Sequence, residues 1–259
     1  MTYNFHTHTA RCSHATGTEE EYILRAISGG IRRMGFSDHV PLRFDDGFES
    51  AYRVPTDQVP AYFETLRALR EKYRDQIELY IGFEMEYYRD CFPQMLADVK
   101  AAGAEYLILG EHFCVPEHPG PSLHSMRDHA DEESIAFYVS TVIEAMNTGV
   151  FSYVAHPDLF RFSGDPAVYE RHMRRLCRAA VETATPLEIN FLGIRENRIY
   201  PNDAFWVIAG QEKAPVTFGF DAHDVESAYD EASIVKARAM VKNFGLNYIG
   251  EPELRLLRK

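Results

Sequence analysis

The chain has 259 residues, which is long enough for one large domain or two small ones. Hydrophobic residues make up 46% and charged residues 25% of it, and these globular proportions exclude collagen-like, low-complexity and disordered chains. The formal net charge is −12, from 27 basic and 39 acidic residues, and it repels polyanions, so we expect no nucleic-acid partner.

The sequence also indicates the cellular compartment and the redox state of the cysteines. No apolar run approaches the roughly 20 residues of a membrane span, and the start MTYNFHTHTA has no basic leader, so we expect a cytoplasmic chain with no membrane partner. The cysteines lie far apart without a CxxC pair, which predicts reduced thiols and neither a disulfide framework nor a thiolate zinc site; they are Cys12, Cys91, Cys114 and Cys177. The sequence leaves the oligomeric state open.

Short apolar stretches typical of strands alternate with longer stretches of helical period. The strands are expected to end near Phe5, Ser37, Phe83, Gly110, Ala155, Ile189 and Phe220, with a weaker eighth strand over 246–249. A capping box of Thr18 and Glu21 predicts a first helix that ends near Gly29 or Gly30. Further helices are expected over 59–69, 95–102, 134–147, 166–182, 203–210 and 231–243. This α/β alternation predicts a parallel sheet closed into a barrel, as a single domain over residues 1–259.

Histidines and carboxylates recur directly after the expected strands. His6 and His8 follow the first strand, and because side chains two apart on a strand share a face, the pair can bind one cation. The same placement is found for His39, Glu84, His112, His156, Asp221 and His223, and His14 joins them from the first loop. In a parallel barrel the carboxyl ends of all strands open on one face, so we expect these side chains to converge.

Seven imidazoles and two carboxylates exceed the capacity of one ion, so two or three ions bridged by a carboxylate fit better. The alternative for any single histidine is a hydrogen-bonded residue of the core or rim. Its repetition at successive strand ends favours the metal site.

These segments together resemble the polymerase and histidinol phosphatase (PHP) superfamily, in particular its histidinol-phosphate phosphatases. The resemblance spans nearly the whole chain and depends on Phe5-His6-Thr7-His8-Thr9, Cys12-Ser13-His14, Ser37-Asp38-His39, Gly82-Phe83-Glu84, Gly110-Glu111-His112-Phe113, Ala155-His156-Pro157-Asp158, Leu187-Glu188-Ile189-Asn190 and Phe220-Asp221-Ala222-His223. It implies a distorted (β/α)7 TIM-like barrel with three divalent metal ions, for which Zn, Fe and Mn are equally suitable. One departure is Asn4, where many members carry Asp; an amide cannot neutralise charge, so metal affinity is expected to differ.

The resemblance also implies how the ligands divide. It assigns the first ion to His6, His8, Glu84 and Asp221, the second to Glu84, His112 and His156, and the third to His14, His39 and His223. Glu84 would bridge, and Glu84, Asp221 and His223 would serve catalysis. The implied enzyme is a phosphomonoesterase of histidine biosynthesis that converts L-histidinol phosphate to L-histidinol and phosphate, by attack of a hydroxide that bridges two metals.

Further residues are candidates for contact with this small-molecule phosphomonoester. Arginine offers planar paired donors to phosphate, and Arg161, Arg195 and Arg198 follow expected strand ends, the last two in an expected loop, with Arg195 the strongest candidate. For each of them an exposed surface arginine is the alternative. Asp158 lies beside His156 in the sequence. It is expected either to protonate the leaving group, to hydrogen-bond a metal-binding side chain, or to cap a helix.

The stretch 113–133 is too long and too rich in proline for a minimal connection, with Pro116, Pro119 and Pro121. We expect either a lid or an exposed polar loop. As a lid, it would offer its acidic residues to the amino or imidazole group of the substrate; these are Glu117, Asp128 and Asp131. A second loop, after His39, could shape the pocket through Arg43, Asp45, Asp46 and Arg53.

Other functions remain open at this point. A PHP-type phosphodiesterase or nucleotide phosphatase would use the same metal ligands. An amidohydrolase is disfavoured because a glutamate, Glu84, stands at the expected bridging position where that class often needs a carboxylated lysine. The non-enzymatic alternative is a metal-binding structural module.

Overall fold

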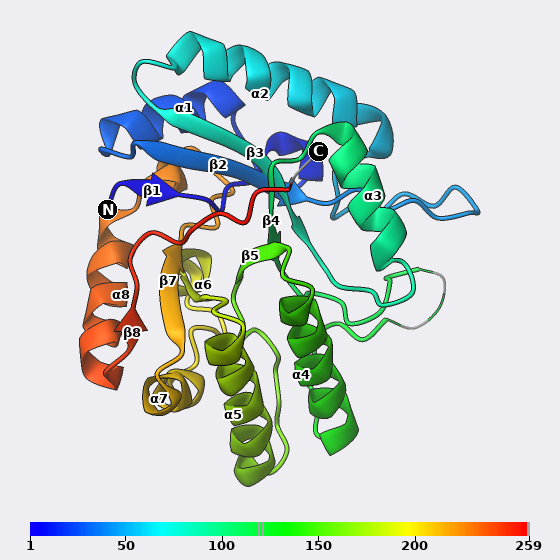
Figure 1. Ribbon diagram of the computed structural model, residues 1–259, viewed down its shortest axis with the longest axis vertical. Helices are drawn as coiled ribbons and strands as arrows, with labels where there is room; N and C mark the ends of the chain where they lie inside the picture. Colours follow the sequence, from blue (N-terminus) through cyan, green and yellow to red (C-terminus); the bar gives the residue numbers. More distant parts are fainter. Residues whose placement is uncertain (119, 121, 258–259) are drawn as a thin grey trace.

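The computed structural model of the chain describes residues 1–118, 120 and 122–257. Eight strands form a single sheet in which every neighbouring pair is parallel and the spatial order follows the chain. They are β1 (Tyr3–Asn4), β2 (Arg33–His39), β3 (Glu78–Met85), β4 (Tyr106–Leu109), β5 (Phe151–Val154), β6 (Leu187–Asn190), β7 (Pro215–Gly219) and β8 (Asn247–Tyr248). The sheet curls, and helices cover its outer side (Figure 1). The predicted α/β TIM-like barrel is confirmed.

The helices lie close to their expected positions. They are α1 (Glu19–Ser28), α2 (Val59–Tyr73), α3 (Phe92–Ala102), α4 (Glu132–Asn147), α5 (Pro166–Glu182), α6 (Phe191–Glu196), α7 (Asp203–Glu212) and α8 (Glu231–Phe244), with 3-10 turns at η1 (Ala10–Cys12), η2 (Thr56–Gln58) and η3 (Glu226–Ala228). The capping box that starts α1 is present, with Thr18 and Glu21 each accepting from the other's backbone N–H. Helix α6 replaces part of an expected loop, because the Asn190 side chain caps it by accepting from the backbone N–H of Gly193.

The barrel closes at its carboxyl rim by a contact beyond the ends of β1 and β7. The backbone N–H of His8 donates to the carbonyl of Ala222 at 2.9 Å, and the N–H of Ala222 donates to the carbonyl of His6 at 3.2 Å. At the opposite end β8 pairs with the start of β7, at Pro215 and Val216. The same edge of β7 therefore meets β1 at the rim and β8 below it. This shared edge accounts for a distorted seven-stranded barrel with an eighth strand inserted.

Apolar side chains fill the lower part of the barrel. Its interior cluster consists of Tyr3, Phe5, Tyr106, Ile108, Tyr153 and Ala155, against which Leu254 packs. The segment after β8 crosses this end of the barrel (Figure 1), where the backbone N–H of Leu257 donates to the carbonyl of Glu105 at 2.8 Å. A larger core lies between the sheet and the surrounding helices. The polar part of the barrel interior lies at the carboxyl rim.

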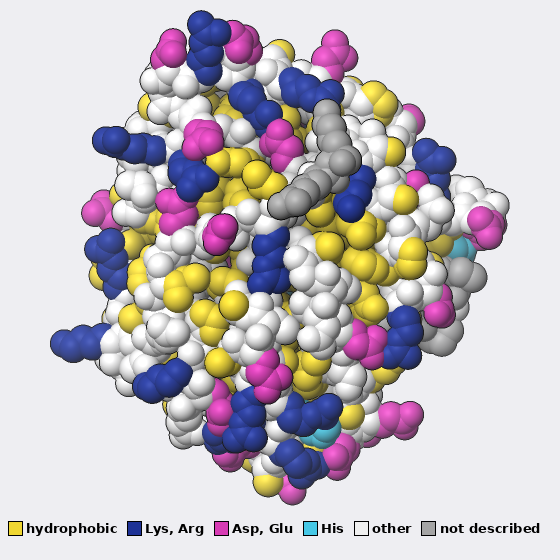
Figure 2. Space-filling model, in the orientation of Figure 1, with side chains coloured by type: hydrophobic (Ala, Val, Ile, Leu, Met, Phe, Trp, Pro, Cys, Tyr) yellow, Lys and Arg dark blue, Asp and Glu magenta, His cyan; other side chains and the backbone are white. Residues whose placement is uncertain are grey.

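The surface carries both signs of charge. On the face shown in Figure 2, basic and acidic side chains are interspersed, and the described residues form no continuous basic patch there. Within the described parts of the chain, no helix combines the length and the apolar character needed to cross a membrane.

Candidate metal centre

The nine side chains predicted to meet at the carboxyl rim lie together there. The register of β2 against β3 places His39 beside Glu84, and the contact between the ends of β1 and β7 brings His6 and His8 to Asp221. The remaining members enter from the loops after β4, β5 and β7 and from the first loop; they are His112, His156, His223 and His14. Residues that are far apart in the sequence, from His6 to His223, thus share one site.

Glu84 is at the centre of this group. Its carboxylate is 1% exposed and faces five imidazoles. From the two oxygens of Glu84, the imidazole nitrogens lie at 2.9 Å for His156, 3.2 Å for His39, 3.4 Å for His8, 3.5 Å for His6 and 3.6 Å for His112. A carboxylate surrounded in this way can bridge two cations that each also bind imidazole.

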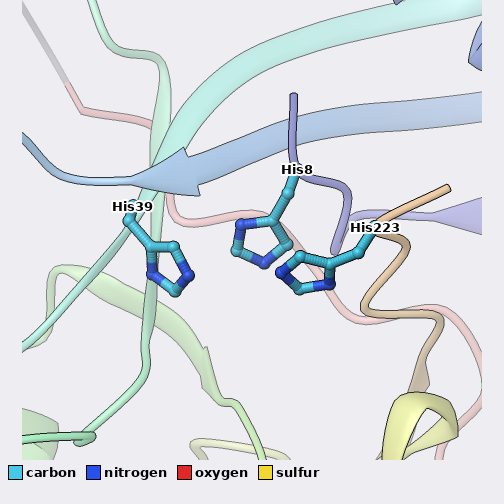
Figure 3. A group of neighbouring side chains, drawn as sticks. All are labelled: His8, His39 and His223. Atoms are coloured by element: carbon cyan, nitrogen blue, oxygen red, sulfur yellow. The ribbon is translucent and has the colours of Figure 1, made fainter. Parts of the chain in front are cut away.

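Asp221 forms a second centre on the other side of His8. Its Oδ1 lies 3.2 Å from Nε2 of His8, 3.4 Å from Nε2 of His6 and 3.3 Å from Nδ1 of His223. Figure 3 shows His8, His39 and His223 pointing toward one another. The ring centroid of His8 lies 4.0 Å from that of His223 and 4.4 Å from that of His39, and His14 follows at 4.9 Å from His223.

The ligand atoms form groups small enough for single cations. Nitrogen and oxygen atoms within 4.8 Å of one another come from His6, His8 and Asp221, from His6, Glu84 and His156, and from His8, His39 and His223. A further group joins Cys12 to His14 and His223, so the described thiol nearest the site lies among the imidazoles. These groups overlap with the sets implied by the resemblance, but His8 joins His39 and His223 where His14 was expected.

The backbone is strained at two of these positions. His156 and Asp221 have φ angles of 32° and 47°, in the left-handed region that residues with a Cβ seldom adopt. Each lies two residues beyond a strand end, after Val154 of β5 and Gly219 of β7. Gly110 provides space at the same level, because a Cβ on that residue would overlap a carboxylate oxygen of Glu84.

Charge coupling is strong in this buried group. Burial opposes protonation of His6, but the carboxylates of Glu188, Asp221 and Glu84 outweigh it and raise the pKa of His6 to about 10. Burial would raise the pKa of Glu84, yet the surrounding imidazoles hold that pKa well below its usual value. Burial and the neighbouring His8 lower the pKa of His39. The carboxylates are thus kept ionised, which is the state that binds divalent cations, whereas a cation bound by His6 would have to displace a proton from its imidazole.

Several ligand atoms have no partner of their own. Nε2 of His6, Nε2 of His8 and both carboxylate oxygens of Glu84 are buried and accept or donate no hydrogen bond within the described residues. Leaving a buried polar atom unpaired costs about 1–3 kcal/mol, so such a concentration indicates a missing partner. Imidazole nitrogens and carboxylate oxygens suit divalent transition metals. The residues present therefore fit metal ions at this rim.

A second layer of polar groups, for which the sequence predicted no role, holds the imidazoles. Glu188 on β6 lies 2.8 Å from Nδ1 of His6, and Glu86 lies 3.3 Å from Nδ1 of His112. Asn190 donates from Nδ2 to Glu188 at 2.8 Å and to Asp221 at 2.9 Å. Polar residues in or just after a buried strand, two positions from a candidate ligand or from each other, are the signal that could have found them.

The predicted phosphate-binding arginines do not lie together. Arg198 lines the cavity above the metal-binding side chains. Arg195 donates to the carbonyls of Phe220 and Asp221, at 2.9 and 3.0 Å, so its guanidinium holds the end of β7 outside that cavity. Arg161 is exposed and lies 3.6 Å from Asp128. Among the three, Arg198 alone is placed to meet a substrate in this structure.

Asp158 is buried behind the site and lies outside the cavity lining. Its Oδ2 accepts from the backbone N–H of Asn202 at 2.6 Å and from the indole N–H of Trp206 at 2.9 Å. Burial raises its pKa to about 7. The carboxyl does not cap a helix; its hydrogen bonds fix the segment before α7.

Asn4, the departure noted in the sequence, binds backbone groups and no candidate ligand side chain. Its side chain accepts from the N–H of His6 and donates to the carbonyl of Ala228.

The long loop after β4 folds against the rim. Its acidic residues do not reach the cavity lining, since Glu117 pairs with Arg53, Asp128 lies near Arg161 and Asp131 caps α4. Pro119 and Pro121 lie outside the described residues. The loop instead supplies His124 and Met126 to the cavity. From the loop after β2, Arg53 lines the cavity, whereas Arg43, Asp45 and Asp46 do not.

A cavity of about 350 Å³ opens above the cluster. Candidate metal-binding side chains form its floor, with His14, His39, His112, Asp221 and His223 among them. Its walls are mainly aromatic and apolar, from Tyr52, Phe113, Met126, Leu192 and Tyr200, with Arg53, Glu86, His124, Glu196 and Arg198 as the polar members. The volume suits a small molecule.

Comparison with known protein families matches residues 4–191 to the PHP domain. The chain belongs to the PHP family. The predicted resemblance is thereby confirmed, and the match covers the chain from β1 through β6 into α6. All of the proposed ligands except Asp221 and His223 lie inside it.

Individual relatives agree with this assignment. The "Probable histidinol-phosphatase" of Deinococcus radiodurans is 24% identical over 225 residues, which cover 84% of this chain and 85% of that protein. The "Histidinol-phosphatase" of Bacillus subtilis is 26% identical over 259 residues, covering 87% and 96%. The solved histidinol phosphate phosphatase of Lactococcus lactis, complexed with Zn, L-histidinol and phosphate, superposes with a TM-score of 0.73 at 19% identity and covers 99% of both chains, so the two share a fold.

Proposed function

We propose that this protein is a metal-dependent phosphomonoesterase that hydrolyses L-histidinol phosphate to L-histidinol and phosphate. The observation that carries the proposal is the cluster of nine imidazole and carboxylate side chains around Glu84, with buried ligand atoms left unpaired, on the floor of a small cavity. The choice of substrate is supported by PHP relatives named histidinol-phosphatase that align with most of the chain.

In this proposal three divalent ions, Zn, Fe or Mn, would be held by the ligands that converge at the rim. His6, His8, Glu84 and Asp221 would hold the first, Glu84, His112 and His156 the second, and His14, His39 and His223 the third. When bound, such ions polarise phosphoryl oxygens and lower the pKa of a bound water toward about 7. Several distinct ligand groups that share His8 or His6 support more than one ion at the rim.

The protein's own residues orient the ligands and the substrate. Glu188 fixes the Nδ1 side of His6, so that Nε2 faces Glu84 and Asp221. Glu86 does the same for His112. Arg198 supplies a positive charge at the cavity wall for a phosphate. Asp158 and Arg195 act on position alone, by holding the segment before α7 and the end of β7.

The aromatic and apolar walls support a small organic leaving group. The ring centroids of Phe113 and His124 lie 4.7 Å apart with the rings tilted by 59°, and the ring centroid of Tyr52 lies 6.0 Å from that of Phe113. A flat ring such as imidazole packs well on such surfaces. Glu86 is 3% exposed and lines the same cavity, where it pairs with Arg53 at 2.7 Å, so the two side chains add a polar, charge-compensated patch to the wall.

The test is turnover by protein of known metal content. Purified protein is loaded with Zn, Mn or Fe, its metal content is measured, and phosphate release is followed with L-histidinol phosphate, nucleoside monophosphates, a phosphodiester and an aryl phosphate. We expect the highest kcat/KM for L-histidinol phosphate. Turnover confined to the diester or the nucleotides would overturn the substrate. Three bound metals without turnover of any phosphoester would favour the structural module.

A further inference from the structure

Tyr200 is a cavity residue that none of the predicted roles includes. It lies in the segment between α6 and α7, is 3% exposed, and lines the cavity together with Arg198, Asp221 and His223. Its ring centroid lies 5.7 Å from that of His156. The phenol therefore lies in the cavity lining, close to a residue of the candidate metal centre.

The hydroxyl of Tyr200 has a proton to offer. Nη1 of Arg198 donates to the Tyr200 oxygen at 3.2 Å, so this contact uses a lone pair and leaves the O–H free. Among the described residues no acceptor takes that O–H. Burial and the nearby Asp221 raise the pKa of the phenol, which keeps the proton in place at neutral pH. A buried donor without an acceptor needs a partner, and the cavity is where that partner can lie.

Two anchors fix the backbone on either side of this phenol. Asp158 accepts from the N–H of Asn202 at 2.6 Å, which ties down the chain just after Tyr200. Gly193 lies under Tyr200, where a Cβ would overlap both the Tyr200 carbonyl oxygen and its ring. The close approach of Gly193 and the bond to Asp158 position the hydroxyl before a ligand arrives. Such preorganised donors stabilise an anion more than mobile ones do.

Arg198 and Tyr200 together form a donor pair at the cavity wall. The guanidinium is held by Glu196, whose carboxylate accepts from Nε at 2.7 Å. Nη1 then faces the phenol oxygen, so a positive charge and a neutral O–H lie next to each other. An anion with several oxygens can accept from both groups at once, which is the property of a phosphoryl group.

We propose that Tyr200 is a further catalytic residue, whose phenol donates a hydrogen bond to a non-bridging phosphoryl oxygen of the substrate. This inference rests on the proposed function, because it takes a phosphomonoester as the ligand of the cavity. No proton is transferred in this role: the O–H bond stays intact, and the hydrogen bond strengthens as charge gathers on the phosphoryl oxygens. The substrate class is any phosphomonoester whose phosphate reaches the cavity floor.

The experiment compares Tyr200→Phe with wild type in Zn-loaded protein. The variant keeps the ring and loses only the hydroxyl. Tyr169→Phe is the matched control, because it removes another buried tyrosine hydroxyl, on α5 and outside the cavity lining. Inorganic phosphate is the probe: its dissociation constant is measured by calorimetry, beside metal content, Tm, and kcat and KM for L-histidinol phosphate.

For Tyr200→Phe we expect phosphate to bind about ten-fold more weakly and kcat/KM to fall at least as much, as for one hydrogen bond to a charged group. Metal content and Tm should match those of the control. Phosphate binding and kcat/KM both within about two-fold of wild type would overturn the assignment. So would unchanged phosphate binding with a loss of turnover for alkyl esters but not for an aryl phosphate, because the phenol would then act on the leaving group.

The two proposals fail in different ways. If wild type binds phosphate but hydrolyses no phosphomonoester, the proposed function is wrong, and phosphate binding by the two variants still decides the role of Tyr200. If wild type hydrolyses L-histidinol phosphate and Tyr200→Phe behaves as the control does, only the assignment of Tyr200 is wrong. If Zn-loaded wild type binds no phosphate, both are wrong.

Discussion

The carboxylate of Glu188 lies 2.8 Å from Nδ1 of His6, and both side chains are fully buried. This contact fixes which nitrogen of His6 carries the proton, so that Nε2 is free to face Glu84 and Asp221. The other oxygen of Glu188 accepts from the backbone N–H of His156 at 3.1 Å. One carboxylate thus orients a ligand from the end of β1 and the strained turn after β5.

Glu188→Gln keeps the size and the acceptor oxygen but removes the charge. We expect metal affinity to fall by about 10- to 100-fold, as is typical when a carboxylate behind a metal-binding histidine is lost. Competition with a chromogenic chelator measures this affinity. Glu144→Gln is the control, because Glu144 pairs with Arg89 at the surface, away from the rim. Equal affinities in the two variants would show that Glu188 does not support the site.

A two-point ion pair joins the loops on either side of the cavity. Nε of Arg53 lies 2.6 Å from one oxygen of Glu117, and Nη2 lies 3.0 Å from the other. Burial would raise the pKa of Glu117, but Arg53 holds that pKa below its usual value of 4.5. The stability from this lowered pKa is present above about pH 4.5 and is lost as the pH falls through the lower, folded-state value.

Glu117→Gln is therefore expected to reduce the free energy of unfolding by about 1–3 kcal/mol at pH 7, since a buried charged hydrogen bond is weakened. The difference from wild type should shrink as the pH is lowered below about 4.5, because wild-type Glu117 then becomes neutral too. Urea unfolding of both proteins at stepped pH gives the difference directly. A difference that is the same at pH 7 and below pH 4 would contradict this account.

Arg195 and Arg198 should respond to mutation in opposite ways. Arg195→Ala removes two donors to the carbonyls at the end of β7, so we expect a loss of roughly 1–3 kcal/mol in stability and phosphate affinity within about three-fold of wild type. Arg198→Ala should weaken phosphate binding by about ten-fold or more, with little effect on Tm. Calorimetry with inorganic phosphate and thermal melts test both. Weaker phosphate binding in Arg195→Ala alone would restore Arg195 as the phosphate clamp.

Asp158 can be tested as a positioning residue against its alternative as a general acid. Asp158→Asn keeps an oxygen that can accept from Asn202 and Trp206, so kcat should stay within about ten-fold of wild type. Asp158→Ala leaves two buried N–H groups unpaired, and we expect a loss of roughly 2–4 kcal/mol in stability together with a lower kcat. A general acid would lose about 10²-fold or more in both variants. Steady-state kinetics and urea unfolding separate the two roles.

Much of the fold could be predicted because local sequence patterns mark the ends of many helices and strands. Helix α5 begins and ends where expected, with Asp165 as cap and Pro166 in the first turn. The strand ends were marked by the ligand residues themselves, so the convergence of His39 and Glu84 followed from strand order alone. Helix α6 was missed, because six residues are too few for a helical period to show.

The rest of the site depends on side-chain direction, which the order of residues does not determine. Arg195 and Arg198 are three residues apart, yet one turns back to β7 and the other reaches the cavity wall. Tyr200 becomes a cavity residue only through contacts with Gly193 and through Asp158. The bond to Asp158 joins residues 44 positions apart, so it forms only in the folded chain. The closure of the rim by Thr7 and Ala222 is non-local for the same reason.

Anomalous diffraction from a crystal of the metal-loaded protein, recorded at the absorption edge of the added metal, tests the central claim most directly. The account predicts strong peaks at the rim, with at least two metals sharing the Glu84 carboxylate and each bound by imidazoles of this cluster. Metal peaks elsewhere on the protein, or a rim without metal after loading with excess Zn, would contradict it.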